Sequence, residues 1–183
     1  MFIVQVSPEM TPVAKVGGLA DVVFGLSREL EVRGNDVEIL LPKYDCMRYD
    51  HIFDLPPDFH DLWIPWGDGT VHCTVLFGFV HGRKCFFIEP HSDDRFFERG
   101  CFYGQNDDPV RYAFFAKAAL EFLLALDAGH DRVAYLPLEV DSLRDGLLSL
   151  FECLALQFES RLDRVGVFCH CLSLYIHVLP LRI

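Results

Sequence analysis

Short apolar runs and one helical pattern alternate along the start of the chain. Phe2 to Val6 is apolar and contains β-branched residues, and Val37 to Leu41 is a second run of this kind. Between them, Leu19 to Val32 carries apolar residues at helical spacing and is followed by the stop signal Gly34-Asn35. The pattern predicts a βαβ unit of an open α/β sheet, with parallel strands and a right-handed crossover.

Further along, the pattern changes to shorter apolar runs. Val71 to Val80 and Lys84 to Ile88 flank the turn-like His81-Gly82-Arg83 and predict a β-hairpin at one side of the sheet. A helix is predicted from Pro109 to Leu126, with Asp107 or Asp108 as its cap. We therefore expect a three-layer domain with a mainly parallel sheet and the helix of Leu19 to Val32 on one face.

Composition restricts the classes of function. A chain of 183 residues, about half of them apolar, can bury one domain-sized core, and its net charge of -11 disfavours nucleic acid and anionic membranes as partners. The seven cysteines lack metal or redox spacing and are interpreted as reduced thiols. Met1 to Val6 has neither the basic region nor the cleavage site of a signal peptide, and His170 and His177 interrupt the longest apolar stretch, so we expect a cytoplasmic protein.

The segment from Lys15 to Val22, Lys-Val-Gly-Gly-Leu-Ala-Asp-Val, lies where the first strand leads into the first helix. Ligands bind at the carboxyl ends of strands in open α/β sheets, and helix amino termini favour anions. Gly17 and Gly18 let backbone amides approach a phosphate, and Lys15 adds a point charge. The alternative is structural: the glycines permit a tight turn, Lys15 is solvated, and Asp21 only complements the helix dipole.

The order of these motifs resembles that found in the bacterial glycogen synthases and plant starch synthases. That family opens with a strand, a Ser/Ala-Glu-x-x-P loop and the motif K-x-G-G-L-x-D-V. The similarity covers about residues 1 to 126, and the sequence between Tyr44 and Tyr49 most resembles that of cyanobacterial-type members. The matching segments are Ser7 to Pro12, Lys15 to Val22, Leu26 to Leu30, Gly34 to Val37, Leu41 to Tyr44, Tyr103-Gly104, Asp107-Asp108 and Arg111-Tyr112.

The resemblance implies a Rossmann-like domain, the N-terminal half of a two-domain GT-B glycosyltransferase. It implies transfer of glucose from ADP-glucose to the non-reducing end of an α-1,4-glucan, with no metal and no cofactor. Lys15, Gly17 and Gly18 would then contact the donor, and Asp21 would lie beside the sugar or its acceptor. Tyr103 would stack on the acceptor glucan, or it is an ordinary half-buried aromatic residue.

After residue 126 the sequence departs from the family. The expected His-Asp-Trp motif is missing from residues 127 to 183. The nearest similar segment is Cys169-His170-Cys171, whose spacing is too compact for one tetrahedral metal site. We interpret 127–183 as a divergent tail produced by truncation or a change of reading frame. The chain is then an inactive part of a synthase, a non-catalytic nucleotide-sugar or glucan-binding module, or a nonfunctional product.

Overall fold

The computed structural model describes residues 2–129 and 174–177 of the chain. These fall in two compact units, one holding the strands and α1 and the other holding α2. In chain order the elements are β1 (Phe2–Val6), α1 (Gly18–Val32), β2 (Asp36–Pro42), the short 3-10 helix η1 (Tyr49–His51), β3 (Ile52–Phe53), β4 (Pro57–Trp66), β5 (Gly69–Val80), β6 (Arg83–His91), α2 (Asp108–Gly129) and β7 (Leu174–His177).

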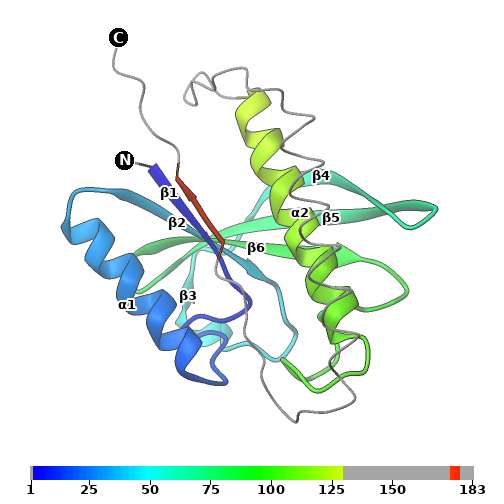
Figure 1. Cartoon of the computed structure of the whole chain (residues 1–183), viewed down its shortest axis with the longest axis horizontal. Coiled ribbons are helices and arrows are strands. Elements are labelled where there is room, and N and C mark those ends of the chain that lie inside the picture. Colours follow the sequence, from blue (N-terminus) through cyan, green and yellow to red (C-terminus); the bar gives the residue numbers. More distant parts are fainter. Residues whose placement is uncertain (1, 130–173, 178–183) are drawn as a thin grey trace. The chain divides into compact units, whose positions relative to one another are not determined.

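The strands of the described residues form one mixed sheet (Figure 1). Its order is β3-β5-β6-β2-β1-β7, with β4 also paired to β5. β1 pairs with β2 and β2 with β6 in parallel, whereas the pairings of β1 with β7 and of β5 with β3, β4 and β6 are antiparallel. The βαβ unit is confirmed. The expectation of a mainly parallel sheet is wrong, because four of the six strand pairings among the described residues are antiparallel.

The centre of the sheet is apolar on both faces. Val37 and the run from Ile39 to Leu41 in β2 are buried, as are Ile3 and Val4 in β1. β6 contributes Cys85 to Ile88, all buried. Continuous apolar runs of this kind are typical of parallel strands that have neighbours on both sides and are covered on both faces. The core of this unit therefore lies along β1, β2 and β6.

Helix α1 lies alongside the sheet and contacts β2 (Figure 1). The residues it buries are Ala20, Val23 and Ser27, which are spaced as one helix face requires. Val22, predicted as part of the apolar stripe, is 58% exposed instead. Val22 is two positions after Ala20, which is about 200° around the helix, so it faces away from the buried side.

The predicted hairpin is confirmed, but its strands are longer and its place differs. β5 has 12 residues and β6 has 9, and β6 lies inside the sheet between β5 and β2. β4, which the sequence did not predict, adds 10 residues antiparallel to β5. Figure 1 shows the β4–β5 hairpin extending well beyond the parallel strands. The second predicted helix is α2, which begins at Asp108 and ends at Gly129.

The predicted divergent tail lies largely outside the described residues. Residues 127–129 continue α2, and residues 174–177 form β7 on the outer edge of β1. His170, with Cys169 and Cys171, lies outside the described part of the chain. No helix in residues 2–129 is both long and apolar enough to span a membrane.

Candidate functional site

The loop from Ser7 to Gly17 carries the predicted donor motif at the carboxyl edge of the parallel strands. It leaves β1 at Val6, and the neighbouring strands β2 and β6 end at the same edge, since all three run in parallel. The loop is not a loose connection: its first residues, Ser7 to Met10, are buried, and so are Val13 and Ala14. Met10 and Ala14 exchange backbone hydrogen bonds of 2.9 and 2.8 Å. Lys15 is thus presented by a folded loop.

Glu9 is buried, with only 5% of its surface exposed, and its carboxylate holds this loop together from within. Its Oε2 accepts hydrogen bonds from the backbone amides of Val16 and Gly17, both at 3.0 Å. Its Oε1 accepts a bond of 2.7 Å from the hydroxyl of Tyr103. A buried carboxylate with three donors is well satisfied. Glu9 therefore joins three parts of the site, the loop, the start of α1 and the segment of Tyr103.

Lys15 and Asp21 form an exposed ion pair in front of this buried centre. Lys15 Nζ lies 2.7 and 2.9 Å from the two carboxylate oxygens of Asp21, and Thr11 Oγ1 donates to the same carboxylate at 2.7 Å. The hydrogen bond from Lys15, followed by that from Thr11, holds the pKa of Asp21 below its usual value. Asp21 is therefore charged at neutral pH and holds Lys15 at the amino end of α1.

The structure brings the predicted site residues together and gives two of them contacts with Glu9 that the sequence did not predict. Lys15, Gly17, Gly18 and Asp21 all lie at the start of α1, as predicted. The Gly17 amide donates to Glu9, and Gly18 is the first residue of α1. Tyr103 donates its hydroxyl to Glu9, so it contributes to the framework of the site.

Sequence reasoning assigned no role to Glu9 or Thr11. Both lie in the Ser-Pro-Glu-Met-Thr-Pro segment that leads into the glycine motif. A carboxylate placed among prolines and apolar residues between a strand and a helix start is a signal that it bonds backbone amides there. That signal was available in the sequence, whereas the partnership of Glu9 with Tyr103 was not.

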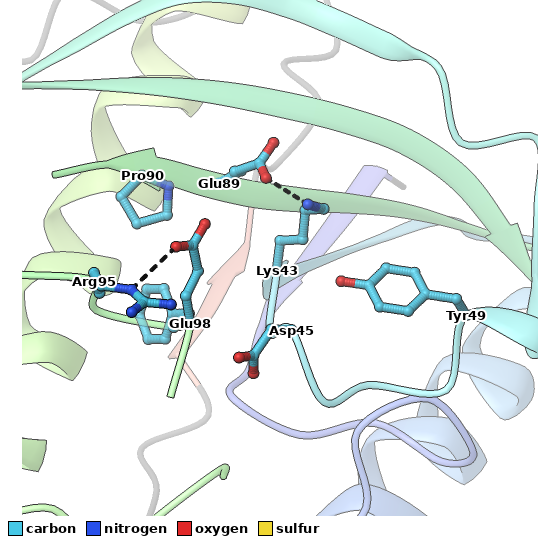
Figure 2. Close-up of a pocket in the computed structure, with 8 residues that line it drawn as sticks. Lys43, Asp45, Tyr49, Glu89, Pro90, Arg95 and Glu98 are labelled. Carbon is cyan, nitrogen blue, oxygen red and sulfur yellow. Dashed lines mark hydrogen bonds and ion pairs between the residues drawn. The ribbon is translucent and has the colours of Figure 1, made fainter. Parts of the chain in front are cut away.

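A hollow opens near the carboxyl ends of β2 and β6 (Figure 2). It has a volume of about 300 Å³ and is lined by Lys43, Asp45, Tyr49, Glu89, Pro90, Arg95, Phe97 and Glu98. Lys43 pairs with Glu89, and Arg95 pairs with Glu98 at 3.6 Å. Burial, with Glu89 nearby, raises the pKa of Tyr49 to about 12, so its hydroxyl remains protonated. We call this hollow the polar pocket.

The chemistry of the two sites differs. The start of α1 offers a cation and helix amides, which suits a phosphate group. The polar pocket offers paired charges and a phenol, which suits a neutral ligand with many hydroxyl groups. Within residues 2–129, no cluster of His, Cys, Asp and Glu has the arrangement of a metal site.

Comparison with known proteins shows which family this chain resembles. Residues 2–135 match the starch synthase catalytic domain. Glycogen synthase 2 of Methylococcus capsulatus is 71% identical over 119 residues, covering 65% of this chain and 24% of that protein. Glycogen synthase 1 of Trichormus variabilis is 66% identical over 123 residues, covering 67% of this chain and 25% of that protein.

A solved structure agrees with these relatives. The catalytic domain of starch synthase IV from Arabidopsis thaliana, bound to ADP and acarbose, has a TM-score of 0.68 and 44% identity, and the match covers 69% of this chain and 26% of that one. The chain thus spans about a quarter of the length of these relatives. The matched residues include β1 to β6, the glycine motif and the Glu9 loop, and the chain belongs to the starch synthase catalytic domain family.

Proposed function

We propose that this chain provides the donor-binding portion of a glucosyltransferase, which moves glucose from ADP-glucose to the non-reducing end of an α-1,4-glucan. The observation that carries the proposal is Lys15, held at the amino end of α1 by a loop that the buried Glu9 fixes. Two further facts support it: relatives of this chain are glycogen synthases, and starch synthase IV binds ADP and acarbose.

The proposal extends to the domain plan. Residues 1–126 would form the three-layer Rossmann-like portion, the first half of a two-domain GT-B enzyme, with 127–183 as a divergent tail. Transfer of a glucosyl group requires preorganised charges around a site from which water is excluded. Since the relatives carry about three quarters of their length beyond this match, we propose that this portion alone transfers glucose poorly.

Donor binding would exchange one anion for another at Lys15. In the structure its ammonium group is held by Asp21. A diphosphate at the start of α1 would take over that ammonium group and the Gly18 amide, because phosphate offers more acceptor oxygens and fits the helix dipole. Asp21 would then be released toward the sugar. Glu9 keeps the loop in place through this exchange, since it bonds the backbone and not Lys15.

Replacing Lys15 with alanine tests the proposal directly. We expect the affinity for ADP to fall about tenfold to a hundredfold, because a charge-assisted bond to phosphate contributes roughly 1.5–3 kcal/mol. Lys15→Arg should restore it only in part, since a planar guanidinium fits poorly where a compact ammonium group binds. Isothermal titration calorimetry with ADP and ADP-glucose measures both variants.

Lys84 provides the matched control for the loss of a positive charge. It is also an exposed lysine in an ion pair, 3.1 Å from Asp36, at the opposite end of β2 and β6. Lys84→Ala should leave ADP affinity unchanged. Equal binding by wild type, Lys15→Ala and Lys84→Ala would show that the glycine motif is structural in this chain.

Replacing Asp21 with asparagine should act in the opposite direction. It removes the anion that competes with phosphate for Lys15, and it keeps the size of the side chain and its contact with Thr11. We expect affinity for ADP to rise by a factor of about two to five, the range that an exposed ion pair allows. The same calorimetric titration measures it. A fall in affinity would mean that Asp21 contributes to nucleotide binding and is not its competitor.

A further inference from the structure

The loop that follows β2 lies against a segment 55 residues later in the chain. Both carboxylate oxygens of Asp45 accept a hydrogen bond from the Gly100 amide, each at 3.0 Å. One residue to either side, the ring of Tyr44 meets the ring of Phe102 edge-on, with the centroids 4.9 Å apart. A charge-assisted hydrogen bond and an aromatic contact therefore hold these two short segments together.

Each of the two segments carries a cysteine at this junction. Cys46 directly follows Asp45, and Cys101 lies between Gly100 and Phe102. The two thiols also act on each other: burial, then Asp45, and to a smaller degree Cys101, raise the pKa of Cys46. Both cysteines are partly exposed, so a small oxidant in solution can reach them. The fold thus places two accessible thiols side by side.

The other two cysteines of residues 2–129 are of a different kind. Cys73 and Cys85 are 0% exposed, and burial raises the pKa of each thiol to about 12. They remain protonated at neutral pH, and a protonated thiol is a poor nucleophile. They are also apart in the sheet, since Cys73 is opposite Pro90 and Cys85 is opposite Gly78. These two cysteines belong to the core.

We propose that Cys46 and Cys101 form a reversible disulfide bond, which fastens the segment of Tyr103 to the loop after β2. Tyr103 follows Cys101 by two residues, and its hydroxyl donates to the buried Glu9. The bond restrains this segment where it supports the carboxylate of Glu9. Disulfides of proteins in reducing compartments are usually transient and respond to redox conditions. The structure describes the thiol form, and oxidation closes the bond.

A peroxide supplies the oxidising equivalents. The thiolate of Cys101 attacks one peroxide oxygen, so that an S–O bond forms, the O–O bond breaks and the other oxygen leaves as water after protonation. The sulfur of Cys46 then displaces hydroxide from this sulfenic acid, and the hydroxide takes the thiol proton of Cys46 to form a second water. Cys46 takes this second step because its raised pKa keeps it protonated. A dithiol reductant reopens the bond by exchange.

Treatment of the full chain with hydrogen peroxide tests the proposal, with the remaining thiols blocked by iodoacetamide before digestion without reductant. Trypsin cuts after lysine and arginine, so Cys46 leaves in the peptide Tyr44–Arg48 and Cys101 in the peptide Gly100–Arg111. Mass spectrometry should find these two peptides joined, lighter than their sum by a pair of hydrogen atoms. Dithiothreitol should separate them again.

Thermal melts measure what the bond does to the fold. Oxidation should raise the Tm of the wild type by roughly 4–16 °C, the shift that one disulfide gives in a chain of this length. Cys46→Ser and Cys101→Ser each remove one partner at nearly constant size, and oxidation should leave their Tm unchanged. Cys73→Ala is the matched control, because it removes a core cysteine and retains both partners, so its bond should form as in the wild type.

The results separate this bond from other oxidation products. No joined pair, or Cys46 or Cys101 joined instead to any of the other five cysteines, overturns the proposal. A rise in Tm in oxidised Cys46→Ser or Cys101→Ser equal to that of the wild type also overturns it. A joined pair with an unchanged Tm overturns the restraint on the Tyr103 segment. No measurement uses ADP or ADP-glucose, so the result is independent of the proposed function.

Discussion

Replacing Tyr44 with alanine should lower the free energy of unfolding by about 3–5 kcal/mol, the usual cost of removing a buried aromatic ring. Tyr44 follows β2 and is 0% exposed. Its ring meets Phe97 and Phe102 edge-on, with centroids 5.4 and 4.9 Å away. Its hydroxyl donates to the carbonyl of Pro8 at 3.0 Å. Equilibrium urea unfolding measures the change.

The conservative variant separates the ring from the hydroxyl group. Tyr44→Phe keeps the packing and loses one hydrogen bond, so we expect a loss of only about 0.5–1.5 kcal/mol. ADP affinity should also fall in Tyr44→Ala, because Tyr44 connects the donor loop at Pro8 to the segment that lines the polar pocket. A loss below 1 kcal/mol in Tyr44→Ala would contradict the packing described here.

Replacing Glu9 with alanine should cost about 2–5 kcal/mol of stability and most of the ADP affinity. The change leaves the amides of Val16 and Gly17 and the hydroxyl of Tyr103 without their acceptor in a partly buried site. An unsatisfied buried polar group costs roughly 1–3 kcal/mol. The loop that presents Lys15 would lose its internal support. Urea unfolding and ADP calorimetry on the same preparation measure the two effects.

Glutamine at position 9 is the matched control. Its oxygen can still accept from the two amides, and its amide group can donate to Tyr103 once that hydroxyl turns. Glu9→Gln should therefore retain most of the stability and ADP binding. If Glu9→Gln were as damaging as Glu9→Ala, the negative charge, and not the hydrogen-bond geometry, would be what the loop requires.

The parts of the fold that the sequence predicted are those set by local pattern. The apolar runs of β1 and β2, the helical spacing of α1 and the Gly34-Asn35 stop need no distant partner. β4 was missed because Pro57 and Pro65 interrupt its pattern. The structure accommodates them because, among the strands of residues 2–129 and 174–177, β4 pairs with β5 alone and is an edge strand, where proline is tolerated.

In the candidate site, too, the contacts between residues close in sequence could be predicted, and those between distant residues could not. Lys15 and Asp21 could be placed together because six positions separate them across a helix start. Glu9 and Tyr103 are 94 positions apart, so their contact depends on the whole βαβ arrangement. The pairing of Trp63 on β4 with His72 on β5 depends on the register of the two strands, and a shift of one residue in β4 would turn Trp63 to the other face. Sequence pattern alone does not determine that register.

The position of β7 beside β1 has a consequence for how the chain folds. The outer edge of β1 pairs with β7, from Ile3 with His177 to Val6 with Leu174. β2 follows β1 after one loop and one helix, so that parallel pairing closes early, whereas the pairing with β7 must wait until the chain has been made as far as His177. During that interval an apolar strand presents an open edge, which is the feature that recruits strands from other chains.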